Sequence, residues 1–161
     1  MTETHNIHAT ALVVDGVGLI IRGPSGAGKS LLALELLDEW EARGKSAKLV
    51  SDDRVDIVVG VMGLTLKAPK AIEGLAELRG RGLVSRPFVA EAPLHLVIDL
   101  VETLERMVEE DELTTELFGV KLPRAPVPRN GVVDARHQLL LVREAIRAVG
   151  SPRGKTRQKT T

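Results

Sequence analysis

The chain has 161 residues, and its 43% hydrophobic content against 27% charged residues predicts one globular domain with an aliphatic core over residues 1–150. Its 22 basic and 22 acidic residues cancel, which argues against attraction to nucleic acid or a membrane surface, and the absence of cysteine excludes disulfides and zinc–thiolate sites. Without a signal-peptide pattern or an apolar run of about 20 residues, the chain is expected to be cytoplasmic.

The first predicted elements surround a glycine-rich loop. Residues 8–22 predict two strands joined at Asp15-Gly16, because this dipeptide supplies the positive φ angles of a tight hairpin turn. Residues 30–44 place apolar side chains at the spacing of one helix face, and Gly44 follows as a C-cap. The order of elements is therefore strand, loop and helix.

The rest of the chain predicts alternating strands and helices. Residues 47–51 predict a short buried strand that ends before two aspartates. The acidic run 109–112 predicts a solvated loop or helix end, and residues 151–161 predict a disordered basic tail. The other expected elements are strands over 55–68 with a turn at Gly63, a helix over 69–80 between Pro69 and Gly80, a strand over 92–101, and a final helix over 134–149.

The segment "GPSGAGKS" has the complete phosphate-binding pattern G-x-x-x-x-G-K-S, with a predicted strand before it and a predicted helix after it. Its glycines allow successive backbone N–H groups to point at phosphate oxygens. The lysine would reach the β and γ phosphates, and the serine hydroxyl would ligate Mg²⁺. The predicted nucleotide-binding residues are Gly23, Pro24, Ser25, Gly26, Ala27, Gly28, Lys29 and Ser30.

Acidic residues follow two of the predicted strands. Asp52 and Asp53 form a pair, whereas Asp99 stands alone in the pattern of an ordinary Walker B strand. A carboxylate pair offers a proton acceptor for an incoming hydroxyl as well as a metal ligand, and this favours a kinase over a plain nucleotide hydrolase. A small-molecule kinase that uses Asp99 is the alternative, but such an enzyme needs an arginine-rich lid, and the short segment "VPRN" does not resemble one.

Five segments in order resemble the catalytic domain of the HPr kinase/phosphorylase family over roughly residues 6–135. The Glu77–Gly82 segment, "ELRGRG", is the most specific of them, because other P-loop proteins have no reason to contain it. The five segments are "HATALVVDGVGLIIRGPSGAGKS", "LVSDDRVDI", "AIEGLAELRGRGLV", "LERMVEEDELTTELFGVKLP" and "APVPRN".

The resemblance implies an α/β fold, a P-loop kinase core of the HPr kinase/PEP carboxykinase-like type with a mixed β-sheet and flanking helices. The implied activity is ATP- and Mg²⁺-dependent phosphorylation of a serine on HPr, the phosphocarrier of the sugar phosphotransferase system. The implied reverse reaction is phosphorolysis of phosphoserine-HPr by inorganic phosphate, which yields pyrophosphate. The resemblance also implies a homo-oligomer, hexameric in the family, and a compact form without the N-terminal domain of longer members.

The resemblance also implies roles for individual residues. Ser30 and Glu77 would ligate Mg²⁺. Asp52 would accept the serine proton, with Asp53 beside it, although the two could exchange roles. The implied catalytic residues are His8, Lys29, Asp52, Asp53 and Arg106. His8 would lie against the acid pair, and Arg106 would be supplied to a neighbouring subunit. Arg129 lies in the loop that the family uses mainly for dephosphorylation.

Two departures from the family pattern keep a second interpretation open. Leu31 replaces the acid that commonly follows the P-loop serine, and there is no room for the N-terminal domain of longer members. A nucleotide-responsive regulatory module with little turnover is therefore the alternative to an enzyme. For docking of a protein substrate, the sequence offers residues 80–93, with Arg81, Arg86 and Phe88.

Overall fold

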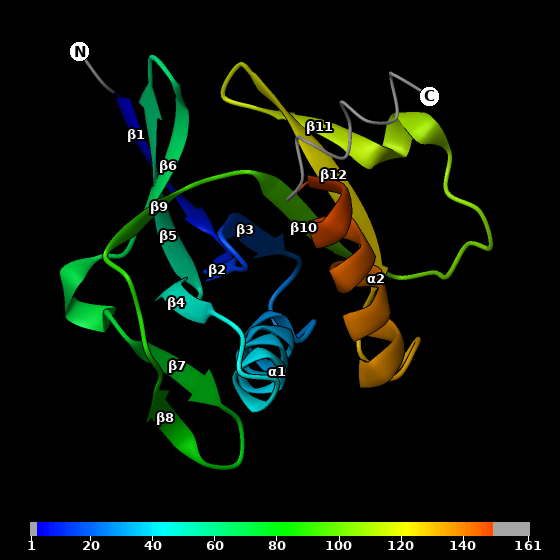
Figure 1. Cartoon of the computed structure of the whole chain (residues 1–161), viewed down its shortest axis with the longest axis horizontal. Coiled ribbons are helices and arrows are strands. Elements are labelled where there is room, and N and C mark those ends of the chain that lie inside the picture. Colours follow the sequence, from blue (N-terminus) through cyan, green and yellow to red (C-terminus); the bar gives the residue numbers. More distant parts are fainter. Residues whose placement is uncertain (1–2, 150–161) are drawn as a thin grey trace.

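The computed structural model describes residues 3–149, which form two sheets, a separate hairpin and two helices (Figure 1). The large sheet has the order β11 (Thr114–Leu117), β12 (Val120–Pro128), β10 (Leu96–Val101), β3 (Val17–Arg22), β2 (Thr10–Val14) and β4 (Ala47–Ser51). The small sheet has the order β1 (Glu3–His8), β5 (Arg54–Gly60), β6 (Gly63–Lys67) and β9 (Glu91–Pro93). The hairpin pairs β7 (Leu75–Leu78) with β8 (Gly82–Ser85), and the helices are α1 (Lys29–Ala42) and α2 (Ala135–Val149).

The large sheet is mixed, since β10 runs parallel to β3 and β12, whereas β2, β4 and β11 pair antiparallel with their neighbours. Successive residues of a strand point to opposite faces of a sheet. Leu19 and Ile21 of β3 accordingly lie in one core cluster with α1 and α2, whereas Ile20 lies in a second cluster with β5 and β6. The large sheet is thus covered by the helices on one face and by the small sheet on the other.

The elements around the P-loop agree with the sequence predictions. Asp15 and Gly16 have φ angles of 51° and 78° and connect β2 to β3 as a tight turn. Helix α1 ends at Ala42, and Gly44 follows with a φ of 70°. The final helix is also confirmed as α2, which buries Val142 and Ile146 against the large sheet and α1.

The helix predicted over 69–80 is wrong. A short 3₁₀ helix occupies Lys70–Ile72, and the chain then enters strand β7. Gly74 breaks the helical pattern with a φ of 75°, and a Cβ there would lie 2.7 Å from the Phe88 ring. The alternation of a buried Ala76 with an exposed Glu77 fits a strand that packs one face against the protein.

Two further segments differ from expectation. Residues 92–101 do not form one strand, because β9 pairs with β6 in the small sheet while β10 joins the large sheet. In the segment that resembles a family helix and strand, Arg106 lies in an exposed loop, followed by a 3₁₀ helix at Glu110–Leu113 and by β11. In the acidic run, Glu109, Glu110 and Asp111 are exposed, as their charge predicts, and Glu112 is half-buried.

Among residues 3–149, no helix has both the length and the apolar character needed to cross a membrane.

Candidate active site

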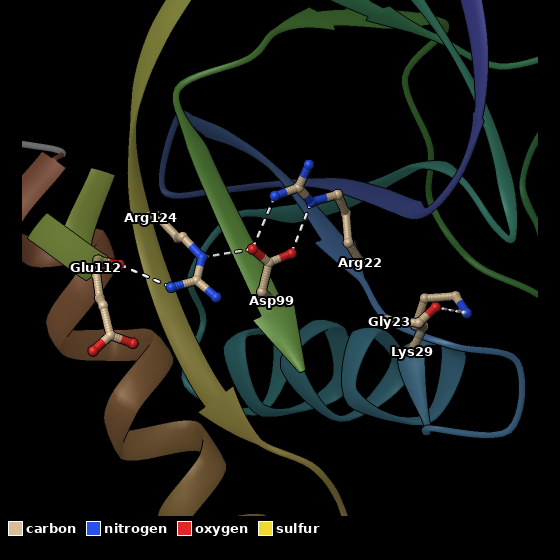
Figure 2. Close-up of polar contacts among 6 residues, drawn as sticks. All are labelled: Arg22, Gly23, Lys29, Asp99, Glu112 and Arg124. Carbon is tan, nitrogen blue, oxygen red and sulfur yellow. Dashed lines mark hydrogen bonds and ion pairs between the residues drawn. The ribbon is translucent and has the colours of Figure 1, made fainter. Parts of the chain in front are cut away.

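The P-loop connects β3 to α1, which begins at Lys29. Gly26 and Gly28 have φ angles of 84° and 95°, a left-handed conformation that favours glycine and that turns loop N–H groups inward. The Lys29 side chain is buried, and its Nζ donates a hydrogen bond to the Gly23 carbonyl oxygen at 2.8 Å (Figure 2). It also donates to the Pro24 carbonyl oxygen at 3.2 Å. The ammonium group is therefore fixed over the loop, where it can also reach a phosphate oxygen.

Asp52 is the buried carboxylate of the site. Its Oδ1 accepts hydrogen bonds from Thr10 Oγ1 at 2.9 Å and from Ser30 Oγ at 2.6 Å, and its Oδ2 accepts one from the Glu77 backbone N–H at 2.9 Å. Asp52 therefore lies between the P-loop and the β7–β8 hairpin. A carboxylate oxygen has two lone pairs, so Oδ1 is saturated while Oδ2 can accept one more hydrogen bond.

Asp53 differs from Asp52 in exposure and in backbone conformation. It is exposed, and its φ of 66° is in the left-handed region, which aspartate tolerates better than most residues. The connection from β4 to β5 consists of these two residues, and the Arg54 N–H donates to the Asp52 carbonyl oxygen at 2.8 Å. This tight turn directs two successive carboxylates differently, one into the protein and one toward solvent.

A cavity of about 600 Å³ brings the predicted phosphate-binding and acidic residues together. The P-loop contributes one part of its lining, the Asp52-Asp53 turn a second, and the β7–β8 hairpin a third. The lining residues are Ser25, Gly26, Gly28, Lys29, Ser30, Leu31, Asp52, Asp53, Arg54, Ile72, Leu75, Glu77, Leu78, Arg79, Leu83 and Asn130.

Gly23, Pro24 and Ala27 of the P-loop do not line the cavity, and neither do three predicted residues beyond the loop, which are His8, Arg106 and Arg129. His8 is exposed at the end of β1, and the neighbouring Ala9 N–H donates to the Asp53 carbonyl oxygen at 3.2 Å. Within residues 3–149, no hydrogen bond joins the His8 side chain to either aspartate, so His8 approaches the pair through the backbone. Arg106 is exposed, and Arg129 Nε donates to Glu102 at 2.9 Å.

Asp99 is held by two arginines (Figure 2). Arg22 donates to it from Nε at 2.7 Å and from Nη2 at 2.8 Å, and Arg124 donates from Nε at 2.6 Å. Burial alone would raise the pKa of Asp99, but hydrogen bonds and positive charge from Arg22 and Arg124 outweigh it and lower that pKa. Arg124 also donates to the Glu112 carbonyl oxygen at 2.9 Å. Asp99 therefore joins β3, β10 and β12 in an ion-pair network and does not line the cavity, which argues against its use as the Walker B acid.

Sequence reasoning missed the apolar residues of the lining and four polar residues of the site. Thr10 holds Asp52 from a strand 42 residues away, and no local pattern indicates this contact. Arg54, Arg79 and Asn130 line the cavity. All four stand in segments that resemble the family: Thr10 lies in the first, Arg54 in "LVSDDRVDI", Arg79 in "ELRGRG" and Asn130 at the end of "APVPRN".

The oxygen groups around Ser30 fit a magnesium ion. Mg²⁺ prefers oxygen ligands and is usually held by one or two protein groups together with water and substrate phosphates. The described residues contain no cluster of three or more histidine, aspartate or glutamate side chains that could hold a metal by itself. The Ser30 hydroxyl, the adjacent Asp52 carboxylate and the cavity-lining Glu77 carboxylate supply such a partial set.

A P-loop between a strand and a helix, with its serine bonded to a strand-end aspartate, defines a P-loop phosphate-binding protein of the α/β class. A family model for the HPr serine kinase C-terminal domain matches residues 1–153. The chain therefore belongs to this family, which confirms the resemblance and the predicted fold class.

The family assignment agrees with comparisons to individual proteins. The HPr kinase/phosphorylase of Acidovorax sp. (strain JS42) is 34% identical over 154 residues, covering 88% of this chain and 46% of that protein. The corresponding protein of Clostridium acetobutylicum is 34% identical over 128 residues, covering 75% of this chain and 40% of that protein. The chain thus spans less than half the length of these relatives.

A solved structure has the same fold. The Hpr(Ser) kinase/phosphatase from Coxiella burnetii matches with a TM-score of 0.75 at 27% sequence identity, and the match covers 97% of this chain and 96% of that chain. The likeness extends over both sheets and the helices, because almost the whole of each chain is aligned.

Proposed function

We propose that the protein transfers the γ-phosphoryl group of ATP to a serine hydroxyl of an HPr-type phosphocarrier protein, and that it also catalyses the reverse phosphorolysis with inorganic phosphate. The observation that supports this most is the position of Asp52, which bonds the P-loop serine on one side and the hairpin of the "ELRGRG" segment on the other. One carboxylate thus touches both the phosphate-binding part and the family-specific part of the site. Because the reaction consumes ATP, we place it in the cytoplasm.

In this proposal the P-loop binds the phosphates of ATP through its backbone N–H groups, with Lys29 over the loop. Ser30 and Glu77 hold Mg²⁺, which neutralises charge on the phosphate oxygens when it is bound. Arg54 and Arg79, which line the same cavity, add positive charge. Phosphoryl transfer has a loose transition state, so positioning and charge neutralisation provide most of the rate increase.

Asp52 is the proton acceptor of the proposed reaction. Its Oδ2 has one lone pair left, so it can accept a hydrogen bond from the serine hydroxyl of the substrate. Three donors fix the carboxylate, which satisfies the requirement that a general base be held in a defined geometry. Asp53, which is exposed in the same cavity, provides a second negative charge near the incoming hydroxyl and the metal.

The reverse reaction uses the same groups. Inorganic phosphate would occupy part of the P-loop, its oxygen would attack the phosphorus of the phosphoserine, and the bond from phosphorus to the serine oxygen would break to give pyrophosphate. This phosphorolysis is the microscopic reverse of phosphoryl transfer from pyrophosphate to serine, in which Asp52 would accept the serine proton. Asp52 therefore enters phosphorolysis protonated and gives its proton to the departing serine oxygen. We further propose that the protein forms a homo-oligomer in which Arg106, exposed here, contributes to a neighbouring subunit's site.

The proposal is tested by incubating the protein with a purified HPr-type carrier and MgATP and analysing the carrier by mass spectrometry. We expect a phosphoserine on the carrier with the wild type and a loss of at least about 100-fold in rate with Lys29→Ala. Met62→Ser is a matched control, because Met62 is almost fully exposed at the turn between β5 and β6. Nucleotide binding without any phosphoserine would refute the kinase and favour the regulatory module.

A further inference from the structure

The lining of the active-site cavity has an apolar part that the proposed chemistry does not use. Four residues of this part, here called the apolar wall, are Leu31 of α1 and Ile72, Leu75 and Leu83 of the segment around the β7–β8 hairpin. Leu83 is 70% exposed and Leu31 is 38% exposed. Single exposed leucines need no explanation, but several that line one cavity mark a binding surface.

The apolar wall lies next to the proton acceptor. Leu83 is the direct cross-strand partner of Glu77, whose backbone N–H donates to Asp52 Oδ2 at 2.9 Å. Directly opposed residues of an antiparallel pair place their side chains on the same face, so Leu83 and Glu77 share the cavity face of the hairpin. Leu75, two residues before Glu77, shares that face as well.

The position of Asp52 indicates which substrate meets this wall. Asp52 bonds Ser30 of the P-loop with one oxygen and the hairpin with the other. With nucleotide phosphates on the P-loop, an in-line acceptor must approach Asp52 from outside the loop, and the hairpin borders that approach. The groups nearest to the acceptor hydroxyl are the neighbouring side chains of the same polypeptide.

We propose that Leu31 and Leu83 select the protein substrate by binding an apolar side chain that neighbours the acceptor serine. This inference rests on the proposed kinase function and names a specificity determinant of the same site. Leu31 directly follows the P-loop serine and carries no charge, so it adds exposed apolar area to the lining at this point. A charged or polar side chain next to the serine would lose its hydration against the apolar wall and would gain no hydrogen bond in return, so its binding would be unfavourable.

A second cavity provides room for the substrate chain beyond that side chain. It has a volume of about 420 Å³, lies between α1, α2 and the hairpin, and shares Leu31 and Leu78 with the active-site cavity. The two cavities therefore adjoin each other at Leu31 and Leu78. A polypeptide that places its serine at Asp52 can continue past Leu31 along this surface.

The test measures steady-state kinetics of carrier phosphorylation by the 161-residue chain and its Leu83→Ser and Leu31→Ser variants. The probes are a purified HPr-type carrier with an apolar residue beside its acceptor serine and the same carrier with serine in place of that residue. We expect each variant to raise the KM for the first carrier about tenfold, with kcat and the KM for ATP unchanged. With the second carrier, wild type and variants should have the same KM, because the contact is already absent.

The control is Met62→Ser, which removes an exposed apolar side chain that does not line the cavity and should leave every constant unchanged. An unchanged KM for the first carrier in both leucine variants would overturn the inference. A rise only in the KM for ATP would also overturn it, because the apolar wall would then bind the adenine ring. A change in molecular mass, measured by light scattering, would overturn it as well, because the wall would then bind a second copy of the chain. If the wild type forms no phosphoserine at all, the proposed function itself fails.

Discussion

Replacing Asp99 with asparagine separates the structural role of this residue from the catalytic role that a conventional Walker B acid would have. Asp99 accepts three short hydrogen bonds, at 2.6 to 2.8 Å, from Arg22 and Arg124, and its side chain is 17% exposed. Asparagine keeps one acceptor oxygen but removes the charge. The two arginines would then be left partly buried without a counter-ion.

The expected loss in the free energy of unfolding is about 2 to 4 kcal/mol, which is the range for removing one partner of a largely buried, hydrogen-bonded ion pair. For a chain of this size, it corresponds to a fall in Tm of roughly 5 to 15 °C. The pKa of Asp99 is lowered in the folded protein, so its contribution is present at neutral pH and is lost as the pH falls below about 4. The difference between wild type and Asp99→Asn should therefore shrink from pH 7 to pH 3.

Urea denaturation at both pH values measures this difference, and the phosphorylation rate at pH 7 measures the catalytic role. We expect the variant to keep a kcat within a few-fold of wild type at a temperature where it is folded. Asp38→Asn is the control, since Asp38 pairs with Arg86 at an exposed site and should contribute less than about 1 kcal/mol. A 100-fold loss of kcat at unchanged stability would refute the argument and restore Asp99 as a catalytic acid.

Three further predictions follow from single contacts. Gly18→Ala should lower the free energy of unfolding by about 3 kcal/mol or more, because the new Cβ would lie 1.7 Å from the Pro93 carbonyl oxygen. Gly60→Ala is the control, since its Cβ would lie at an ordinary 3.5 Å from the nearest atom, and it should change the stability to urea little. Burial raises the pKa of Glu35, so ionisation of this carboxyl group opposes folding. Glu35→Gln should therefore raise Tm at pH 8 but not at pH 4, and an equal change in Tm at both pH values would contradict this cause. Ser30→Ala should increase the Mg²⁺ concentration needed for half-maximal activity at least about tenfold in a metal titration, and an unchanged requirement would exclude Ser30 as a ligand.

The elements that could be predicted from sequence are those fixed by local chemistry. The Asp15-Gly16 turn, the P-loop glycines and the apolar spacing of α2 depend on residues close in the chain, and the structure contains all of these elements. Residues 69–80 predict a helix because Pro69 and Gly80 stand where a helix commonly begins and ends. Strand β7 forms there instead, because Gly74 breaks the helix and pairing with β8 satisfies the backbone.

The acid pair was identified from its place after a strand, but the different environments of its two members were not. Asp52 is buried because contacts from Thr10, Ser30 and the Glu77 backbone meet it from segments 22 to 42 residues away. A single sequence gives no signal for such long-range contacts. The ion pair between Asp99 and Arg22 could not be predicted either, because the two residues lie 77 positions apart in the sequence.

The most direct test of the central claim is a comparison of Asp52→Asn and Asp53→Asn in both directions of the reaction. Phosphoserine formation on an HPr-type carrier from MgATP measures the forward rate, and pyrophosphate release from the isolated phosphocarrier with inorganic phosphate measures the reverse rate. We predict that Asp52→Asn lowers both rates by a similar factor of about 10² to 10⁴, because one carboxylate accepts and returns the same proton. A loss in only one direction, or a larger loss in both with Asp53→Asn, would contradict this assignment.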